Sequence, residues 1–231
     1  MQGLYAIVDT DTLARRGIDI VPFVEAVLEA RPAALQLRDK KGNSRRTLEL
    51  LRALAPRCAR ANVPLFANDR PDLALLAGCA GVHLGQLDLP ASAARALTLA
   101  PGAVDPPRTR GLLIGLSTHN ATELDAALAE APDYVAIGPV FPTGSKERPD
   151  PVLGLEVFGA LASHVRHVRP GLPVVGIGGI SLETAGSIGA LANCAAVIGA
   201  LVPEQGEGQA LLDEVRERAR ALSDAIIGGQ A

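Results

Sequence analysis

Short apolar segments and helical segments alternate eight times along this chain, and this alternation limits the fold more than any other feature of the sequence. The apolar segments have the length and composition of strands that are buried on both faces. The predicted strands are Leu4–Val8, Ala33–Leu37, Pro64–Ala67, Gly81–Leu84, Leu112–Leu116, Tyr134–Ile137, Pro173–Ile177 and Ala195–Ile198. The predicted helices are Ile20–Ala30, Arg45–Ala61, Asp72–Ala77, Ala91–Leu99, Thr122–Ala131, Leu155–Arg166, Leu182–Leu191 and Gln209–Ala225.

This pattern predicts an α/β fold, a single-domain (β/α)8 TIM barrel with parallel strands that spans residues 1–231. The length fits, since such barrels commonly have about 200–250 residues. An open doubly wound sheet is the main rival, but it normally has a glycine-rich turn after the first strand, and none follows Leu4–Val8. We expect Ser44 and Ser181 to cap helices, and the tail after about residue 226 to fray.

Composition narrows the class of ligand. The formal net charge of −3 gives no general attraction to nucleic acid or to an anionic membrane, so an anionic ligand must be held by local charge. Cys58, Cys79 and Cys194 lack metal-binding spacing and are expected to be buried, reduced thiols of a cytoplasmic protein. No signal peptide and no apolar run near about 18 residues is present. We expect the partners to be small molecules, and we expect no binding to nucleic acid or to a membrane. The oligomeric state stays open, and a homo-oligomer is one of the possibilities.

Polar residues follow the predicted strands, and the first group lies at the end of the second strand. Gln36, Arg38 and Lys40 alternate there, so their side chains point to one face. Arginine offers two parallel donors and lysine a compact charge, which suits a polyphosphate. The alternative is a strand end with solvated charges. An arginine that points into a barrel needs a partner, which favours the binding interpretation.

Two aspartates follow the next two strands. Asp69 and Asp88 lie at neighbouring strand ends, where a pair of carboxylates can hold Mg²⁺ together with water and substrate phosphates. Helix capping is the alternative, because each aspartate precedes a helix-opening proline by two residues. Asn68 is either a turn residue or an amide that bonds a substrate heterocycle.

The polar cluster after the fifth strand has several interpretations. Thr118 and Asn120 are expected to cap the following helix, whereas Ser117 and His119 stay open, His119 as a candidate general base. His83 is expected to be a core histidine bonded to the backbone. Two further histidines, His164 and His167, fall on an outer helix or at its end and are discounted.

The later strands end in segments suited to a phosphate. Gly176–Ile180 ends the seventh strand and Ile198–Ala200 ends the eighth, where barrel enzymes often hold a phosphate with backbone N–H groups. The loop after Tyr134–Ile137 adds two hydroxyls and a cation, at Thr143, Ser145 and Lys146.

Taken together, these motifs resemble the thiamine-phosphate synthase family from Tyr5 to about Leu201. The matching segments are Gln36–Lys40, Asn68–Asp69, His83–Gln86 with Asp88, Gly115–His119, Gly138–Lys146 and Gly176–Ile180. The resemblance implies a transferase that joins 4-amino-5-hydroxymethyl-2-methylpyrimidine diphosphate to a thiazole phosphate and releases pyrophosphate in a dissociative, Mg²⁺-assisted substitution. Whether the thiazole is carboxylated stays open.

The resemblance also implies roles for individual residues. The pyrimidine diphosphate would be held by Gln36, Leu37, Arg38, Asp39, Lys40, Asn68, Ser117 and Lys146. Mg²⁺ would be held by Asp69 and Asp88. The thiazole phosphate would be held by Thr143, Gly144, Ser145, Gly179, Ile198 and Gly199. The catalytic groups would be Arg38, Lys40, Ser117 and Lys146.

One departure and two alternatives accompany the resemblance. Gly199 stands where the family commonly has serine, so one hydroxyl toward the thiazole phosphate is missing. A thiazole tautomerase-like relative would carry a catalytic histidine where this chain has Pro139, and it would tend to lose residues such as Arg38 and Asp69. A non-catalytic barrel that binds thiamine precursors is the third hypothesis.

The lysine of the 143–146 loop generates a first prediction. Lys146→Ala should slow the chemical step more than it weakens thiazole phosphate binding, because the ammonium acts on charge that develops as pyrophosphate leaves. The expected increase in activation free energy is about 2–4 kcal/mol. Single-turnover kinetics measures the step, and an unchanged single-turnover rate would remove Lys146 from the catalytic set.

Overall fold

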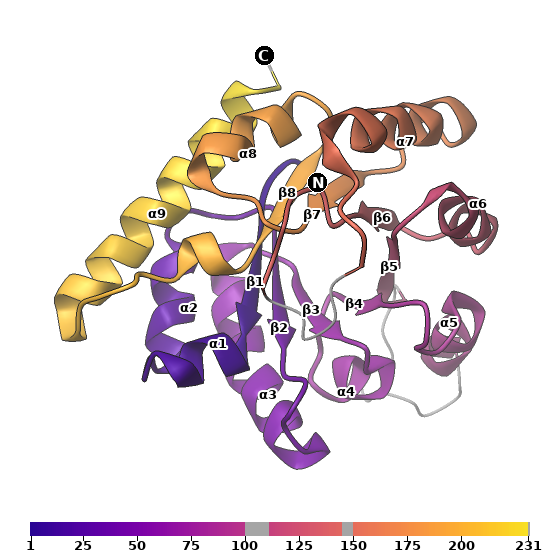
Figure 1. Cartoon of the computed structure of the whole chain (residues 1–231). Helices are drawn as coiled ribbons and strands as arrows, with labels where there is room; N and C mark the ends of the chain where they lie inside the picture. Colours follow the sequence, from indigo (N-terminus) through magenta and orange to yellow (C-terminus); the bar gives the residue numbers. More distant parts are fainter. Residues whose placement is uncertain (100–110, 145–149, 231) are drawn as a thin grey trace.

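Eight parallel strands form a closed barrel, as predicted, in the order β1 to β8, with β1 paired to β8 (Figure 1). The computed structural model describes residues 1–99, 111–144 and 150–230. The strands are β1 (Gly3–Asp9), β2 (Ala34–Arg38), β3 (Leu65–Asn68), β4 (Gly81–Leu84), β5 (Leu113–Thr118), β6 (Tyr134–Ile137), β7 (Val174–Ile177) and β8 (Cys194–Val197). All eight carboxyl ends therefore meet at one rim.

Helices surround the barrel, and most of them match the predicted segments (Figure 1). They are α2 (Ile20–Leu28), α3 (Ser44–Ala61), α4 (Pro71–Leu76), α5 (Ala91–Leu99), α6 (Ala121–Ala129), α7 (Gly154–Val168), α8 (Leu182–Gly189) and α9 (Gly208–Gly228). Two short elements were not predicted, α1 (Thr10–Arg15) and the 3₁₀ turn η1 (Gly199–Leu201). Both directly follow a strand end or the residue after one, so both border the rim.

The core has two layers. The larger layer lies between the strands and the helices, and the smaller one fills the barrel with side chains that include the rings of Tyr5, Phe66 and Tyr134. Glycines make room for these rings. A Cβ atom on Gly81 would lie 2.4 Å from the Phe66 ring, and one on Gly115 would lie 1.9 Å from the Tyr134 ring. The barrel interior is therefore packed around aromatic side chains.

The predicted helix caps are partly wrong. Asn43, not Ser44, occupies the N-cap of α3, because its side chain accepts the Arg46 N–H at 3.0 Å and Ser44 is already helical. Ser181 caps α8 as predicted, with its own N–H donating to Thr184 Oγ1 at 2.9 Å. Asparagine is as good a cap as serine, so composition alone does not choose between adjacent residues.

The carboxyl-terminal helix α9 packs against α8 and α2 (Figure 1). It extends to Gly228, and the Gln230 amide donates to the carbonyls of Ala192 and Asn193 at 3.2 and 2.8 Å. The segment 101–110, which the sequence indicates to be a connector, lies outside the described residues. No helix in the described ranges is long and apolar enough to cross a membrane.

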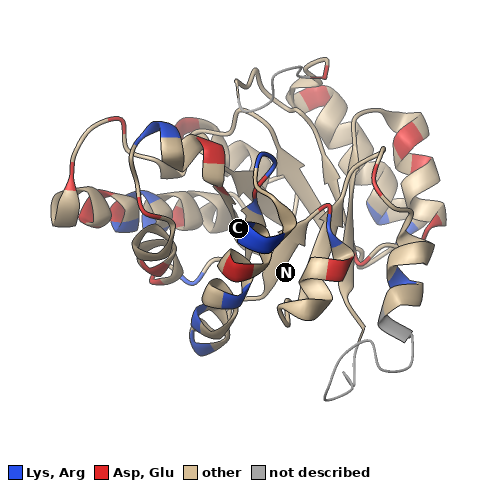
Figure 2. Cartoon of the chain, turned by 90° about the horizontal axis from the view of Figure 1, so that it is seen from below, with Lys and Arg blue, Asp and Glu red and all other residues tan. Residues whose placement is uncertain are grey.

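Positively and negatively charged residues are interspersed along the helices (Figure 2). All three cysteines are buried, as predicted, and burial raises the pKa of the Cys58 thiol to about 11 and that of the Cys194 thiol to about 12. At neutral pH these two thiols are therefore protonated and poorly nucleophilic.

Candidate active site

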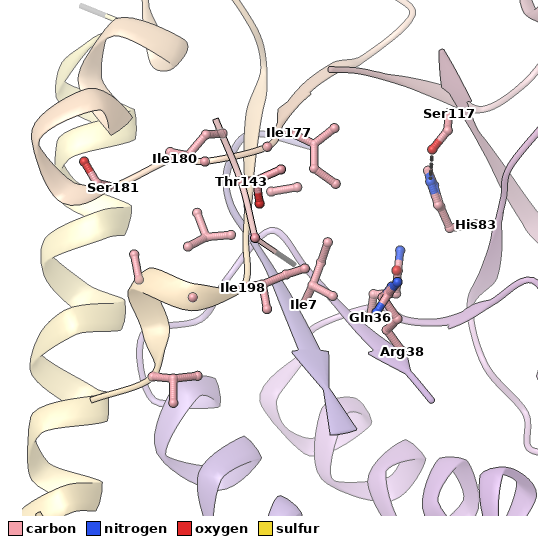
Figure 3. A pocket seen from close by; sticks show the side chains of 18 of the residues that line it. Ile7, Gln36, Arg38, His83, Ser117, Thr143, Ile177, Ile180, Ser181 and Ile198 are labelled. Atoms are coloured by element: carbon pink, nitrogen blue, oxygen red, sulfur yellow. Dashed lines mark hydrogen bonds between the residues drawn. The ribbon is translucent and has the colours of Figure 1, made fainter. Parts of the chain in front are cut away.

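A cavity of about 1220 Å³ opens at the rim formed by the strand carboxyl ends (Figure 3). Most of the predicted site residues line it, from the second strand to the eighth. They are Gln36, Arg38, Lys40, Asn68, Asp69, Asp88, Ser117, Thr143, Gly144, Gly179, Ile198 and Gly199. Ser145 and Lys146 lie outside the described residues, so their predicted roles stay predictions.

Two predicted residues lie away from the cavity lining. Leu37 is buried between the barrel and its helices, as alternation along β2 requires. Asp39 accepts hydrogen bonds from the hydroxyls of Thr10 at 2.7 Å and Thr47 at 2.8 Å. These contacts tie the loop after β2 to α1 and α3, so Asp39 shapes the segment that carries Lys40.

Arg38 has a buried carboxylate as its partner, which the sequence analysis required but did not identify. That partner is Asp9, only 4% exposed, which lies opposite Arg38 in the β1–β2 register. Asp9 Oδ2 pairs with Arg38, while Oδ1 accepts the Thr12 N–H at 2.8 Å and caps α1. A carboxylate at a strand end before a Thr-Asp-Thr segment was the missed signal, since this pattern is typical of a helix start.

The two predicted metal ligands lie together at the rim. Lys40 Nζ lies 2.5 Å from Asp69 Oδ2, and Asp88 Oδ2 accepts the Gly85 N–H at 2.7 Å. Burial raises the pKa of Asp88, and the neighbouring Asp69 carboxylate raises it further, against the opposing effect of the Gly85 hydrogen bond. Among the described residues, two carboxylates and one ammonium group therefore meet at this part of the rim.

Helix capping does not account for these aspartates. The N-cap position of α4 is Arg70, not Asp69, whose backbone instead has a left-handed φ of 63°. At the start of α5, the Ala91 N–H donates to Glu130 at 2.6 Å, and Asp88 bonds within its own loop. Both carboxylates are left to face the cavity.

The far side of the cavity is built from glycine backbone. Gly178 and Gly179 both have a left-handed φ, of 100° and 64°. Added Cβ atoms would lie 2.5 Å from the Pro139 Cβ and 2.3 Å from the Pro142 carbonyl oxygen, so the β7 and β6 loops pack too closely for side chains. Gly199 differs, because no atom of the other described residues, its chain neighbours apart, lies within 4 Å of a Cβ built there.

His83 is a buried core histidine, as predicted, and each of its ring nitrogens lies within hydrogen-bond distance of a side chain. Its Nε2 lies 2.8 Å from Ser117 Oγ at the cavity (Figure 3), and its Nδ1 lies 2.9 Å from the Tyr134 hydroxyl in the barrel interior. The sequence analysis anticipated neither of these side chains, which come from strands 51 and 34 residues further along the chain. Their approach depends on strand register, which the sequence analysis did not assign.

The polar residues after β5 make different contacts from one another. Asn120 caps α6, as predicted, by accepting the Glu123 N–H at 2.9 Å. Thr118 is not a cap, because its hydroxyl donates to a β6 carbonyl oxygen at 3.2 Å. His119 lines the cavity, with Nδ1 2.8 Å from Glu123 and Nε2 3.1 Å from Asp150, so carboxylates flank both ring nitrogens.

The cavity also extends toward α9, which sequence analysis did not anticipate. Arg218 and Glu217 line this part, and Arg218 is paired with Glu214 at 2.7 Å. An i, i+4 pair on a helix normally indicates a solvent-exposed face, so its spacing gives no signal of a cavity.

An eight-stranded parallel barrel that collects its cations, carboxylates and glycine loops in one cavity at the strand carboxyl ends defines the class of (β/α)8-barrel enzymes. Comparison with known proteins narrows the class. Residues 4–201 match the family model described as thiamine monophosphate synthase. A thiamine-phosphate synthase of Myxococcus xanthus is 38% identical over 230 residues, which cover 99% of this chain and 94% of that protein.

A second thiamine-phosphate synthase, from Koribacter versatilis, is 40% identical over 94% of this chain and 92% of its own length. The solved structure of a thiamine phosphate pyrophosphorylase from Pyrococcus furiosus superposes with a TM-score of 0.77 at 27% identity, covering 100% of this chain and 98% of the other. The chain therefore belongs to the thiamine monophosphate synthase family, and it is a transferase.

The Asp9–Arg38 pair generates a stability prediction. Asp9→Asn keeps a capping side chain for α1 but leaves Arg38 without its carboxylate, so the free energy of unfolding should fall by about 1–3 kcal/mol. Urea denaturation measures the change. Asp11→Asn is the matched control, because Asp11 is half-buried and pairs at 3.5 Å with the exposed Lys41, and loss of this pair should cost less than about 1 kcal/mol. Equal losses in the two variants would contradict the role given to Asp9.

Proposed function

We propose that this transferase couples 4-amino-5-hydroxymethyl-2-methylpyrimidine diphosphate to thiazole phosphate and forms thiamine phosphate. The bond between the pyrimidine methylene carbon and the diphosphate oxygen breaks first, and pyrophosphate leaves with the electron pair. The aminopyrimidine delocalises the positive charge on the methylene carbon. The thiazole nitrogen then donates its lone pair to that carbon, so one C–N bond replaces one C–O bond.

One observation carries the proposal: cations and a carboxylate pair lie together on the ends of β2, β3 and β4. Arg38 and Lys40 line the cavity beside Asp69 and Asp88, so cationic and metal-binding chemistry can act on the same leaving group. Preorganised positive charge stabilises a transition state in which negative charge builds up on pyrophosphate. Arg38 is itself held by Asp9, which limits the freedom of its guanidinium.

The carboxylate pair fits Mg²⁺. Hard oxygen ligands suit this cation, which usually keeps several waters and substrate phosphates in its shell. No group of three or more His, Cys, Asp or Glu side chains within the described ranges could hold a metal, so Asp69 and Asp88 would share the ion with water and diphosphate. When bound, Mg²⁺ would neutralise charge on the leaving group.

The opposite side of the cavity would take the thiazole phosphate. Thr143, Gly179 and the Ile198–Gly199 pair line this side, and glycine lets the backbone approach an anion closely. No protein nucleophile is needed, since the attacking nitrogen belongs to the substrate. The thiols of Cys58 and Cys194 agree with this, because buried, protonated thiols are poor nucleophiles. Free cysteines are also what a protein of the reducing cytoplasm would have.

Two other functions would use the same barrel. A thiazole tautomerase-like activity would need a catalytic histidine near the β6 end, where this chain has Pro139. A non-catalytic binding protein would keep every binding contact without turnover. Retention of Arg38, Lys40, Asp69 and Asp88 at the rim favours the synthase.

Incubation with both substrates and Mg²⁺ tests the proposal, with thiamine phosphate and pyrophosphate followed by mass spectrometry. We expect both products in equal amounts, and their loss when EDTA removes the metal. Binding of both substrates without product would support the non-catalytic alternative and would overturn the proposed reaction.

Asp88 generates a prediction that links stability to activity. Its raised pKa means that its contribution to stability is present below its unfolded pKa and is lost as pH rises through the folded value. At pH 7 without metal, Asp88→Asn should therefore raise the unfolding temperature, while it lowers Mg²⁺-dependent turnover more than about tenfold. Below about pH 4 the difference in stability should vanish.

Asp72→Asn is the control, because a hydrogen bond from Arg70 lowers the pKa of Asp72 and the same substitution should have the opposite sign. Differential scanning fluorimetry at several pH values measures both variants. An Asp88→Asn variant that unfolds earlier but stays active would indicate a purely structural aspartate.

Gly199 generates a prediction about the phosphate side. Its backbone does not have a left-handed φ and the described residues leave open space around it, so serine fits there without strain. Gly199→Ser should tighten thiazole phosphate binding by at most about 1.5–3 kcal/mol, the contribution of one hydrogen bond to a charged group. Isothermal titration measures the affinity, and pyrimidine diphosphate binding should not change.

Gly228→Ser is the matched control, since Gly228 also has open space and lies at the end of α9. If Gly199→Ser shifts the affinities for both substrates together, then Gly199 supports the shape of the barrel mouth and not the phosphate itself.

A further inference from the structure

A continuous chain of hydrogen bonds crosses the barrel interior and ends at the cavity. Gln36 Nε2 lies 2.9 Å from the Tyr5 hydroxyl, which lies 2.8 Å from the Tyr134 hydroxyl. Tyr134 continues to His83 Nδ1 at 2.9 Å, and His83 Nε2 reaches Ser117 Oγ at 2.8 Å. Gln36 and Ser117, the two ends of this chain, both line the cavity, and Figure 3 shows the Ser117 hydroxyl bonded to His83.

Burial makes the direction of each hydrogen bond matter. Tyr5, Gln36 and Tyr134 are each 2% exposed and His83 is 8% exposed, so water is kept from their polar atoms. A buried donor without an acceptor keeps the full cost of its lost hydration. Burial also raises the pKa of both tyrosines well above the usual value, so both hydroxyls carry their hydrogen at neutral pH.

Counting donors from the Gln36 end fixes the direction. The Gln36 amide nitrogen only donates, so the Tyr5 oxygen accepts there. The Tyr5 hydrogen then needs its own acceptor, and the Tyr134 oxygen is the one that the described residues provide. The Tyr134 hydrogen is thereby directed to His83 Nδ1.

A neutral imidazole that accepts at Nδ1 carries its hydrogen on Nε2. His83 then donates from Nε2 to Ser117 Oγ, and the Ser117 hydrogen is free to turn toward the cavity. In the opposite direction, Tyr5 would receive two donors and its own hydrogen would have no acceptor within the described residues. Ser117 would then donate its hydrogen to His83, and only the lone pairs of its oxygen would be available to a ligand.

We propose that Gln36, Tyr5, Tyr134 and His83 are positioning residues that hold His83 as the Nε2–H tautomer and make Ser117 a hydrogen-bond donor to an anionic oxygen in the cavity. The identity of that oxygen as part of the diphosphate rests on the proposed function; the tautomer does not. A phosphate oxygen only accepts hydrogen bonds, so a Ser117 that donates attracts it and a Ser117 that only accepts repels it.

Packing holds the chain in one arrangement. His83 stacks on Tyr134 with ring centroids 5.7 Å apart and an interplanar angle of 20°. The centroid of the Phe66 ring lies 5.8 Å from that of the Tyr5 ring and 5.6 Å from that of the Tyr134 ring. Gly115, which lies opposite Tyr134 in the β5–β6 register, leaves the space that the Tyr134 ring occupies. The rings therefore have little freedom to exchange hydrogen-bond partners.

The tautomer is tested by ¹⁵N NMR of the histidine-labelled protein without ligand at pH 7. We expect His83 to show a protonated Nε2 and an unprotonated Nδ1, with His164 and His167 on α7 as internal references. An Nδ1–H tautomer would overturn the proposal, whatever the outcome of the turnover assay. The expected tautomer in a protein without synthase activity would uphold the chain and refute only the proposed function.

Gln36→Glu tests the origin of the direction in the same spectra. A carboxylate at this position accepts from Tyr5, so every later hydrogen bond should reverse and His83 should become the Nδ1–H tautomer. Gln36→Leu is the control, because it removes the donor without supplying an acceptor. If His83 keeps the Nε2–H tautomer in the glutamate variant, then Gln36 does not set the direction.

A double-mutant cycle separates positioning from general support of the barrel, with inorganic pyrophosphate and Mg²⁺ as the probe. Tyr134→Phe should weaken pyrophosphate binding about tenfold in the Ser117 background and leave it unchanged in a Ser117→Ala background. Phe66→Leu controls for loss of interior packing and should act equally in both backgrounds. A Tyr134→Phe effect of the same size in both backgrounds would overturn the positioning role.

Discussion

The pairing of β1 with β8 is the constraint on which the rest of the structure depends. It closes the sheet, so all eight parallel strands present their carboxyl ends at one rim. The register of each neighbouring pair of strands sets which residues face one another: Asp9 lies opposite Arg38, and Asn68 lies opposite His83. Residues that are far apart in the sequence thus become neighbours without any long loop to carry them. The strand register therefore determines which side chains meet at the site.

The barrel interior combines support with chemistry. Most interior side chains are apolar, yet a run of hydrogen-bonded polar groups passes between the aromatic rings toward the cavity. Such groups are costly to bury unless each donor finds an acceptor. Here the satisfied arrangement leaves Ser117 facing the cavity in a defined orientation. Preorganisation of this kind reduces the rearrangement needed when an anionic ligand arrives. The same argument applies to Arg38, which Asp9 holds in place before any ligand binds.

The sequence was sufficient for the fold and for much of the site because strand ends in a parallel barrel converge, whatever the details of packing. Gln36, Asp69, Asp88 and Gly179 could be assigned to the rim by that rule alone. The errors concern pairings that local patterns do not encode. The helix α1 has only six residues, and its cap, Asp9, also serves Arg38 across the sheet. The partners of His83 come from other strands, and Asn43 competes with Ser44 for one cap. These outcomes require register and rotamers, which periodicity does not supply.

A crystal structure with pyrimidine diphosphate and Mn²⁺ in place of Mg²⁺ tests the central claim most directly, because Mn²⁺ is located by its anomalous scattering. The account predicts one anomalous peak bound by the Asp69 and Asp88 carboxylates, with the diphosphate oxygens against Arg38 and the Ser117 hydroxyl. Diphosphate bound instead at Gly178–Gly179, with no anomalous peak between the two aspartates, would contradict the account.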